Sequence, residues 1–294
     1  MKYLLAAVFA LVLAACGGGG GGSGGTPPAG VTFDLSCDLT SNYTPGIGDP
    51  IVTAGTGTPT TTIIALHGKN GTAASSTVAT LATDLNVAGY DVIRPNMPWA
   101  NFNWDGSLCD AMAYLDNLID AEITAGKSVI LLGHSMAGPI ALSYAALSNT
   151  TKPDAVVVIA PGHFVGTSMN FDSLHAADVT TAETMVAAGD GDVIATFKTS
   201  NGGTMQSIST TPNIYLSFHS PDQFPDIKAS IPLVSGPTLW QAGLSDPLTT
   251  SAKSLGIIDT IPAGANYDYR EIAGDHYTVI NNVTTELDPW YQGL

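Results

Sequence analysis

Short apolar runs rich in β-branched side chains alternate with longer amphipathic stretches from Thr61 onward. Such alternation of strand-length and helix-length segments is typical of a parallel sheet whose crossover helices cover both faces. We therefore expect an α/β fold with a mostly parallel central sheet flanked by helices. Strands are predicted at residues 62–66, 91–94, 128–132, 155–159, 237–242 and 267–272, with an antiparallel edge strand at 51–53. Helices are predicted at residues 76–88, 108–125, 139–147 and 278–287.

The alternation is interrupted once, between Gly162 and the strand predicted at 237–242. A segment of this length cannot be a bare loop in a compact domain, so an insertion over about 164–234 should carry structure of its own. Segments 176–188 and 214–218 are the best candidates for regular structure. The insertion is expected to cap the site. It is interpreted either as a lid or substrate wall, or as a structural excursion without a ligand role.

The N-terminus has the build of a secretory signal, because Lys2 precedes an apolar run over residues 3–15 that is too short to span a bilayer permanently. The run ends in Leu13-Ala14-Ala15-Cys16, which resembles the lipobox of bacterial lipoproteins. The resemblance implies a signal peptide at 1–15 and acylation of Cys16, the first residue of the mature chain. The alternative is an ordinary signal cut nearby, with Cys16 left as a free thiol.

Residues 16–30 are predicted to form a flexible tether, because residues 17–25 are all glycine except for Ser23. Such a stretch cannot pack a core, and it reaches roughly 15–20 Å. By the lipoprotein resemblance, Gly17 after the cysteine favours an outer-membrane anchor, on either face of that membrane. The folded part is expected over 31–294 as one domain that includes the cap insertion.

The charge balance excludes two classes of partner. Lys and Arg number 9 against 25 Asp and Glu, which gives a net charge of −16. Nucleic acids and anionic lipid headgroups both need clustered cations, so the only expected membrane contact is the lipid anchor. The sequence carries no signal for an oligomeric state.

Two cysteines, Cys37 and Cys109, remain after Cys16 is assigned to the anchor. An exported protein meets an oxidising compartment, which favours pairing of two such thiols. A single disulfide is therefore predicted. The alternative of two buried free thiols stays open, because pairing depends on a geometry that the sequence does not specify.

The motif Gly133-His134-Ser135-Met136-Ala137-Gly138 follows an apolar strand and leads into a helix. A turn this sharp holds its serine in a strained, exposed position, and small neighbours are needed because backbone passes close by. The motif resembles the nucleophile elbow of the α/β-hydrolase family, with Ala137 where the family has glycine. The resemblance implies the α/β-hydrolase fold, with Ser135 as the nucleophile.

A serine hydroxyl needs a base to take its proton, and the base needs a third group to hold its tautomer. The family places its catalytic histidine after the last strand, which is where His276 lies. The segment that ends in Asp246-Pro247 resembles the family's acid-bearing loop, so Asp246 is the expected acid. Asp275 is the alternative acid, but it is better placed to cap the last helix.

Two backbone donors should stabilise the oxyanion that forms on the substrate carbonyl. One is the N–H of Met136, which lies at the start of a helix. The other is the N–H of Lys69, because residues 67–71 (His-Gly-Lys-Asn-Gly) resemble the family's His-Gly oxyanion turn. The alternative for this segment is a simple turn.

Loops that follow parallel strands meet at one edge of a sheet, so residues 96–99 and 160–163 should line the same crevice. The substrate-pocket candidates are His67, Trp99 and His163. Trp99 is interpreted either as an apolar wall of the pocket or as loop packing, and His163 either as a substrate contact or as a hydrogen-bonded support. No cysteine or histidine pair has the spacing of a zinc site, and no cofactor is expected.

The sequence therefore predicts a serine hydrolase that cleaves an ester or related acyl bond in a small-molecule or lipid-like substrate, through an acyl-enzyme on Ser135. One alternative is a surface binding protein that kept the fold and lost the reaction. That alternative is disfavoured because no member of the triad is missing. Another alternative is a peptidase, because the same fold supports several acyl-transfer activities.

Overall fold

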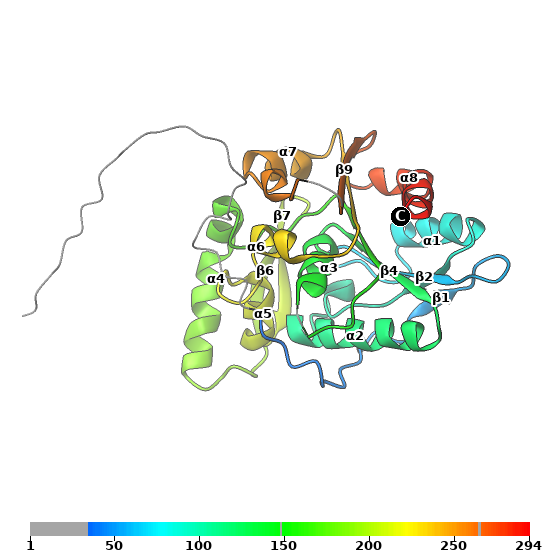
Figure 1. The fold of residues 1–294 in the computed structure, drawn as a ribbon. Coiled ribbons are helices and arrows are strands. Elements are labelled where there is room, and N and C mark those ends of the chain that lie inside the picture. Colours follow the sequence, from blue (N-terminus) through cyan, green and yellow to red (C-terminus); the bar gives the residue numbers. More distant parts are fainter. Residues whose placement is uncertain (1–34, 148, 264–265) are drawn as a thin grey trace, which may run out of the picture. The chain divides into compact units, whose positions relative to one another are not determined.

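A computed structural model describes residues 35–147, 149–263 and 266–294 (Figure 1). The signal peptide predicted at 1–15, the acylation of Cys16 and the tether predicted at 16–30 lie outside these residues. Within the described ranges, no helix has both the length and the apolar character that crossing a membrane requires.

The central sheet of the described chain has seven strands in the order β1-β3-β2-β4-β5-β8-β9. Only β1 runs antiparallel to its neighbour, and the other strands are parallel. The predicted parallel sheet with an antiparallel edge strand is therefore confirmed. The strands are β1 (Ile51–Thr53), β2 (Thr61–Leu66), β3 (Asp91–Arg94), β4 (Ser128–His134), β5 (Ala155–Ile159), β8 (Thr238–Gly243) and β9 (Tyr267–Ile272).

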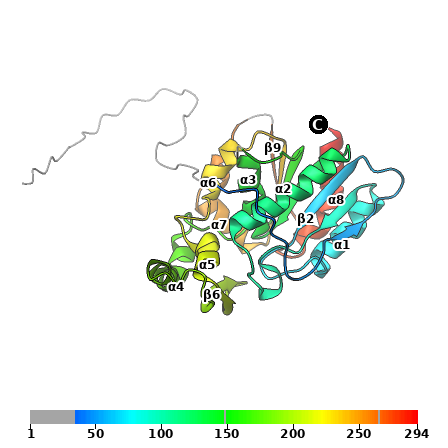
Figure 2. The same cartoon turned by 90° about the horizontal axis from the view of Figure 1, so that it is seen from below.

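Two hydrophobic clusters cover the two faces of this sheet, as the period of a strand requires. In β2, Ile63 and Ala65 belong to one cluster, and Ile64 and Leu66 belong to the other. Figure 2 shows α1 and α8 on one side of the sheet and α2 and α3 on the opposite side. The flanking helices are α1 (Ser76–Val87), α2 (Leu108–Thr124), α3 (Ala137–Ala146), α7 (Pro247–Ser254) and α8 (Val283–Gln292).

The last helix differs from the prediction of 278–287. A 3-10 turn occupies Val279–Asn282, and α8 then runs over Val283–Gln292, beyond Pro289. A proline usually ends a helix because it lacks the N–H that the helix needs. Here Leu287 is fully buried, and Trp290 packs against the same cluster. We infer that burial of this face offsets the hydrogen bond lost at the proline.

The cap insertion carries structure of its own, as predicted, and its elements lie together to one side of the sheet (Figures 1 and 2). Its first helix begins earlier than the predicted 176, at Met169, where the Ser168 side chain accepts a hydrogen bond from the N–H of Phe171. The cap comprises α4 (Met169–Ala187), β6 (Ala195–Asn201), β7 (Thr204–Thr210), α5 (Pro212–His219), α6 (Ile227–Ser230) and a 3-10 turn at Ile231–Leu233.

The antiparallel hairpin β6–β7 was not predicted. Its turn is formed by Gly202 and Gly203, whose φ values of 57° and 78° lie in the left-handed region. Two such residues between alternating runs are a recognised hairpin signal. The sequence signal was therefore present, but it lay between the two segments, 176–188 and 214–218, that were singled out for regular structure.

Cys37 and Cys109 form a disulfide, so the prediction of a pair holds and the alternative of two free thiols does not. The bond joins the first described segment to the start of α2, across a sequence separation of 72 residues. Cross-linking a loop of this size lowers the conformational entropy of the unfolded chain.

Replacing both cysteines by serine is expected to lower the free energy of unfolding by about 2–5 kcal/mol. Urea denaturation followed by circular dichroism measures the difference. As a control, a reductant should shift the wild-type transition toward that of the double variant and leave the variant unchanged. Equal unfolding midpoints for the oxidised wild type and the variant would contradict a stabilising role for this bond.

Candidate active site

Ser135 lies at the junction between β4 and α3, in a strained backbone conformation. Its φ of 58° is in the left-handed region, which residues with side chains rarely adopt. Neighbouring backbone holds it there: its N–H donates to the carbonyl of Ile159 at 3.0 Å, and its carbonyl accepts from Gly138 at 2.9 Å and from Gly162 at 3.2 Å. Strain maintained in this way is concentrated at functional sites.

Gly133 is the position in this turn where a side chain cannot be accommodated. A Cβ added there would lie 2.2 Å from the carbonyl oxygen of Ala137. Ala137 itself, where the family pattern has glycine, is completely buried in the first turn of α3. The departure from the pattern therefore adds one methyl group that the structure accommodates.

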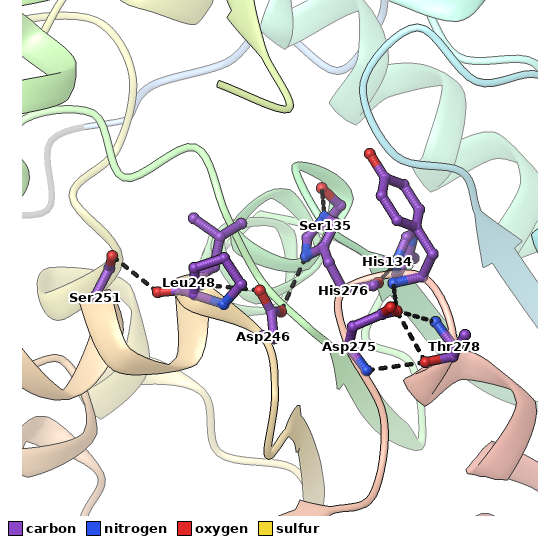
Figure 3. Close-up of polar contacts among 10 residues, drawn as sticks. His134, Ser135, Asp246, Leu248, Ser251, Asp275, His276 and Thr278 are labelled. Carbon is purple, nitrogen blue, oxygen red and sulfur yellow. Dashed lines mark hydrogen bonds and ion pairs between the residues drawn. The ribbon is translucent and has the colours of Figure 1, made fainter. Parts of the chain in front are cut away.

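A continuous chain of hydrogen bonds joins three side chains that are far apart in the sequence (Figure 3). The Nε2 atom of His276 lies 2.9 Å from the Oγ atom of Ser135, and its Nδ1 atom lies 2.9 Å from Oδ2 of Asp246. The Asp246 side chain is buried, and that of His276 is 16% exposed. Asp246 lies directly after β8, and His276 follows β9, so parallel strand ends bring them to Ser135.

Asp246 is also the N-cap of α7. Its second carboxylate oxygen, Oδ1, accepts a hydrogen bond from the N–H of Leu248 at 2.9 Å. Because both oxygens are fixed, the carboxylate has one orientation toward the imidazole. Asp275 does not face this ring nitrogen: its Oδ1 accepts hydrogen bonds from the N–H groups of Tyr277 and Thr278. It caps the turn after β9, and the alternative that it is the triad acid is not supported.

His134 supports the loop that carries His276. Its Nε2 atom lies 2.9 Å from the carbonyl oxygen of His276, and the two rings lie side by side with centroids 5.3 Å apart. Burial lowers the pKa of His134 to about 4, so the ring is neutral and Nε2 donates to that carbonyl. Sequence reasoning missed this contact because it joins residues 142 positions apart and leaves no local pattern.

The two expected oxyanion donors lie beside the serine. A Cβ added at Gly68 would lie 3.0 Å from the Cβ of Ser135, so the loop after β2 passes directly next to the nucleophile. Met136 is the N-cap of α3, where backbone N–H groups are free to bind an anion. Among the described residues, no backbone or side-chain acceptor pairs with the N–H of Lys69 or of Met136.

Residues 61–236, more than half of the 294-residue chain, match the alpha/beta hydrolase fold family. The chain belongs to this family. No curated protein sequence matches the chain significantly.

Solved structures share the fold of this alpha/beta hydrolase at low sequence identity. MenH from S. aureus has a TM-score of 0.57 and 16% identity, over 83% of this chain and 98% of that chain. Est1E from Butyrivibrio proteoclasticus has a TM-score of 0.56 and 14% identity, over 83% and 93%. The alpha/beta hydrolase GrgF from Penicillium sp. sh18 has a TM-score of 0.60 and 12% identity, over 85% and 95%.

A cavity of about 520 Å³ opens beside Ser135 and His276. It lies at the carboxyl ends of the strands, where α/β folds place their ligands. The cap supplies much of its wall, which is where a cap that acts as a substrate wall is expected to lie. The lining residues from the cap and from the loop after β2 include Lys69, Phe164, Phe171, Leu174, Ser200 and Asn201.

The prediction that His67 and Trp99 line the substrate pocket is wrong. Neither residue borders the cavity, and both are at most 1% exposed. His67 accepts a hydrogen bond at Nε2 from the N–H of Met97, and Trp99 donates from Nε1 to the carbonyl of His67. Both residues follow strands at the correct edge of the sheet, but their side chains turn into the core and hold two loops together.

His163 borders the cavity, as expected, and also has a structural partner. Its Nε2 atom lies 2.7 Å from the carbonyl of Phe218 in the cap. Burial, together with the nearby charge of Lys69, keeps the pKa of His163 well below its ordinary value, so the ring is neutral and Nε2 donates. Across the described ranges, no group of three or more His, Cys, Asp or Glu side chains is arranged to hold a metal ion.

Proposed function

We propose that this protein is a serine hydrolase that cleaves an ester or related acyl bond through an acyl-enzyme on Ser135. The observation that carries the proposal is the hydrogen-bond chain from Asp246 through His276 to Ser135, which borders an open cavity. A buried carboxylate, an imidazole and a serine in this geometry form an activated nucleophile.

In the proposed reaction, Oγ of Ser135 attacks the substrate carbonyl while Nε2 of His276 takes its proton. The resulting imidazolium is stabilised by Asp246, and the oxyanion accepts hydrogen bonds from the N–H groups of Lys69 and Met136. Collapse of this intermediate breaks the bond to the leaving group, which receives the proton from His276. Water then attacks the acyl-enzyme, gives one proton to His276, and releases the acid as Ser135 recovers its hydrogen.

Apolar cavity walls and two structural neighbours support an ester substrate. Phe164, Phe171 and Leu248 give the cavity apolar walls suited to an acyl or aromatic group. Est1E has been solved with ferulic acid bound, and LipS and LipT are described as lipolytic enzymes. We propose a small or lipid-like carboxylic ester as the substrate class.

A panel of 4-nitrophenyl acyl esters and peptide 4-nitroanilides, assayed on a soluble form that starts near Thr26, tests this function. We expect hydrolysis of the esters and no measurable cleavage of the amides. Preferential cleavage of the amides would instead identify a peptidase. A folded protein that cleaves neither set would favour a binding protein that kept the fold and lost the reaction.

We also propose that the protein is exported and anchored to the outer membrane through an acylated Cys16. The lipobox-like ending of residues 13–16 supports this proposal, and so does a disulfide of the kind found mainly in oxidising compartments.

Cells expressing the full-length chain and fed labelled palmitate should incorporate the label into the wild type and not into Cys16→Ser. A Cys37→Ser variant is the matched control, and it should incorporate the label normally. Equal labelling of Cys16→Ser would contradict the lipid anchor.

A further inference from the structure

The loop of residues 67–71, which carries the proposed oxyanion donor Lys69, is bound at its two ends to the segment 97–101. At the first end, His67 accepts a hydrogen bond from Met97. At the other end, Gly71 donates to the carbonyl of Gly68 at 3.0 Å and accepts from the N–H of Asn101 at 3.0 Å. Lys69 and Asn70 lie between these two ends, and their side chains take no part in the contacts just described.

The Lys69 side chain reaches the cap hairpin. Its Nζ atom donates to Oγ1 of Thr199 at 3.1 Å and to the carbonyl of Ser200 at 2.9 Å, both in β6. Nζ also lies 5.5 Å from the centroid of the Phe171 ring. Thr199 is completely buried, and its hydroxyl is paired in turn with Nε2 of His219 at 2.8 Å. The amine therefore binds a buried, hydrogen-bonded part of the cap.

The contacts of Lys69 are made to neutral groups. Within the described residues, it forms no ion pair, although the chain has a large excess of carboxylates. Burial lowers the pKa of this amine to about 7, which shows that its position is unfavourable for the charged form. An exposed lysine would avoid this cost, whereas the contacts with Thr199 and Ser200 keep this amine against the cap.

The Asn70 amide is bound on one side by the cap hairpin and on the other by Trp104. Its φ of 57° is left-handed, its Nδ2 donates to Oε1 of Gln206 in β7 at 3.2 Å, and its Oδ1 accepts from Nε1 of Trp104 at 3.2 Å. The carbonyl of Trp104 accepts a hydrogen bond from Thr210, also in β7, at 2.7 Å. One contact to the hairpin is therefore direct, and the other passes through Trp104.

We propose that the cap hairpin β6–β7 is a structural part of the oxyanion hole: through the side chains of Lys69 and Asn70 it holds the backbone N–H of Lys69 at the position of the developing oxyanion. The inference rests on the proposed function. Lys69 thus contributes a backbone donor to the reaction and a side chain that fixes that donor, and Asn70 and Gln206 are positioning residues.

The physical basis is the steep dependence of an oxyanion hole on geometry. Losing one oxyanion donor costs about 10²–10³ in kcat, and a displacement of about 1 Å in an active site can cost 10²-fold. A donor that is loosened rather than lost should have a smaller effect. This donor stabilises the transition state more than it stabilises the bound substrate. Loosening it should therefore lower kcat and change KM little.

Three variants of the full-length chain, purified in detergent, test the proposal. Lys69→Met keeps the backbone N–H and the apolar stem and removes the amine. Gln206→Leu removes the acceptor for Asn70, and Gln206→Glu restores it. Lys198→Met is the matched control, because this exposed lysine precedes Thr199 in the same strand.

Two measurements are compared: kcat and KM for 4-nitrophenyl butyrate, and hydrogen–deuterium exchange in peptides that cover residues 66–75. Lys69→Met and Gln206→Leu should lower kcat by about tenfold or more, with KM within about threefold, and should accelerate exchange in this loop. Gln206→Glu and Lys198→Met should match the wild type in both measurements.

Faster exchange in residues 66–75 with an unchanged kcat would overturn the proposal. Exchange at the wild-type rate in Lys69→Met and Gln206→Leu would also overturn it. So would an equal loss of kcat in Gln206→Glu and Gln206→Leu. In each of these cases the wild type still cleaves the ester, so the proposed function stands. A folded wild type that cleaves no ester would refute the proposed function, and the role of the hairpin in the oxyanion hole would fall with it.

Discussion

Replacing Ser135 with alanine is expected to lower kcat for ester hydrolysis by about 10⁶-fold, because the members of a triad act as one unit. The change removes the hydroxyl that contacts Nε2 of His276, and with it the group that forms the proposed acyl-enzyme. Alanine adds no atom to the turn, so the fold should be retained. Initial rates with 4-nitrophenyl butyrate measure the loss.

Ser173→Ala is the matched control for this experiment. Ser173 is exposed in α4 of the cap, and its hydroxyl bonds only the nearby carbonyl of Asn170 among the described residues. This variant should hydrolyse the ester at the wild-type rate. If Ser135→Ala retained more than a few per cent of the activity, another nucleophile would have to be responsible.

Replacing Asp246 with asparagine is expected to lower kcat by about 10⁴-fold while leaving the geometry intact. Oδ1 can still accept from Leu248, so the cap of α7 is kept. The amide, however, places an N–H donor against Nδ1 of His276, which forces the proton of the neutral ring onto Nε2. In that tautomer Nε2 cannot accept the proton of Ser135.

The matched comparison is Asp275→Asn, which changes the neighbouring carboxylate in the same way. Because the carboxylate of Asp275 caps a turn and does not contact the imidazole, this variant should lose little activity. Stopped-flow and steady-state rates on one ester compare the two variants. A larger loss in Asp275→Asn than in Asp246→Asn would show that the acid has been assigned to the wrong residue.

The strands of the central sheet and its mostly parallel arrangement followed from local signals in the sequence, and the three proposed triad residues followed from those signals together with the family resemblance; the order of the strands was not predicted. A strand that runs into a Gly-bounded serine and then a helix requires a sharp turn, and this turn is what the structure contains. Asp246 and His276 could be located because each follows a strand at a position where the α/β-hydrolase family, which the sequence resembles, carries its acid and its histidine. Parallel strands bring their carboxyl ends together, whatever the identity of the intervening residues.

The composition of the pocket did not follow from the same reasoning. His67, Trp99 and His163 all follow strands at the correct edge, but only His163 borders the cavity. Whether such a side chain points into a cavity or into the core depends on the loop's backbone and its packing neighbours. The contact from His134 to the loop of His276, and those from Lys69 and Asn70 to the cap, join distant segments and have no period or spacing to reveal them.

Reaction with a fluorophosphonate probe, followed by peptide mapping, tests the central claim most directly. We expect a single labelled residue, Ser135, with no labelling of Ser135→Ala and greatly slowed labelling of Asp246→Asn. A folded wild-type protein that stays unlabelled, or a Ser135→Ala variant that labels as readily as the wild type, would contradict the assignment of this serine as the nucleophile.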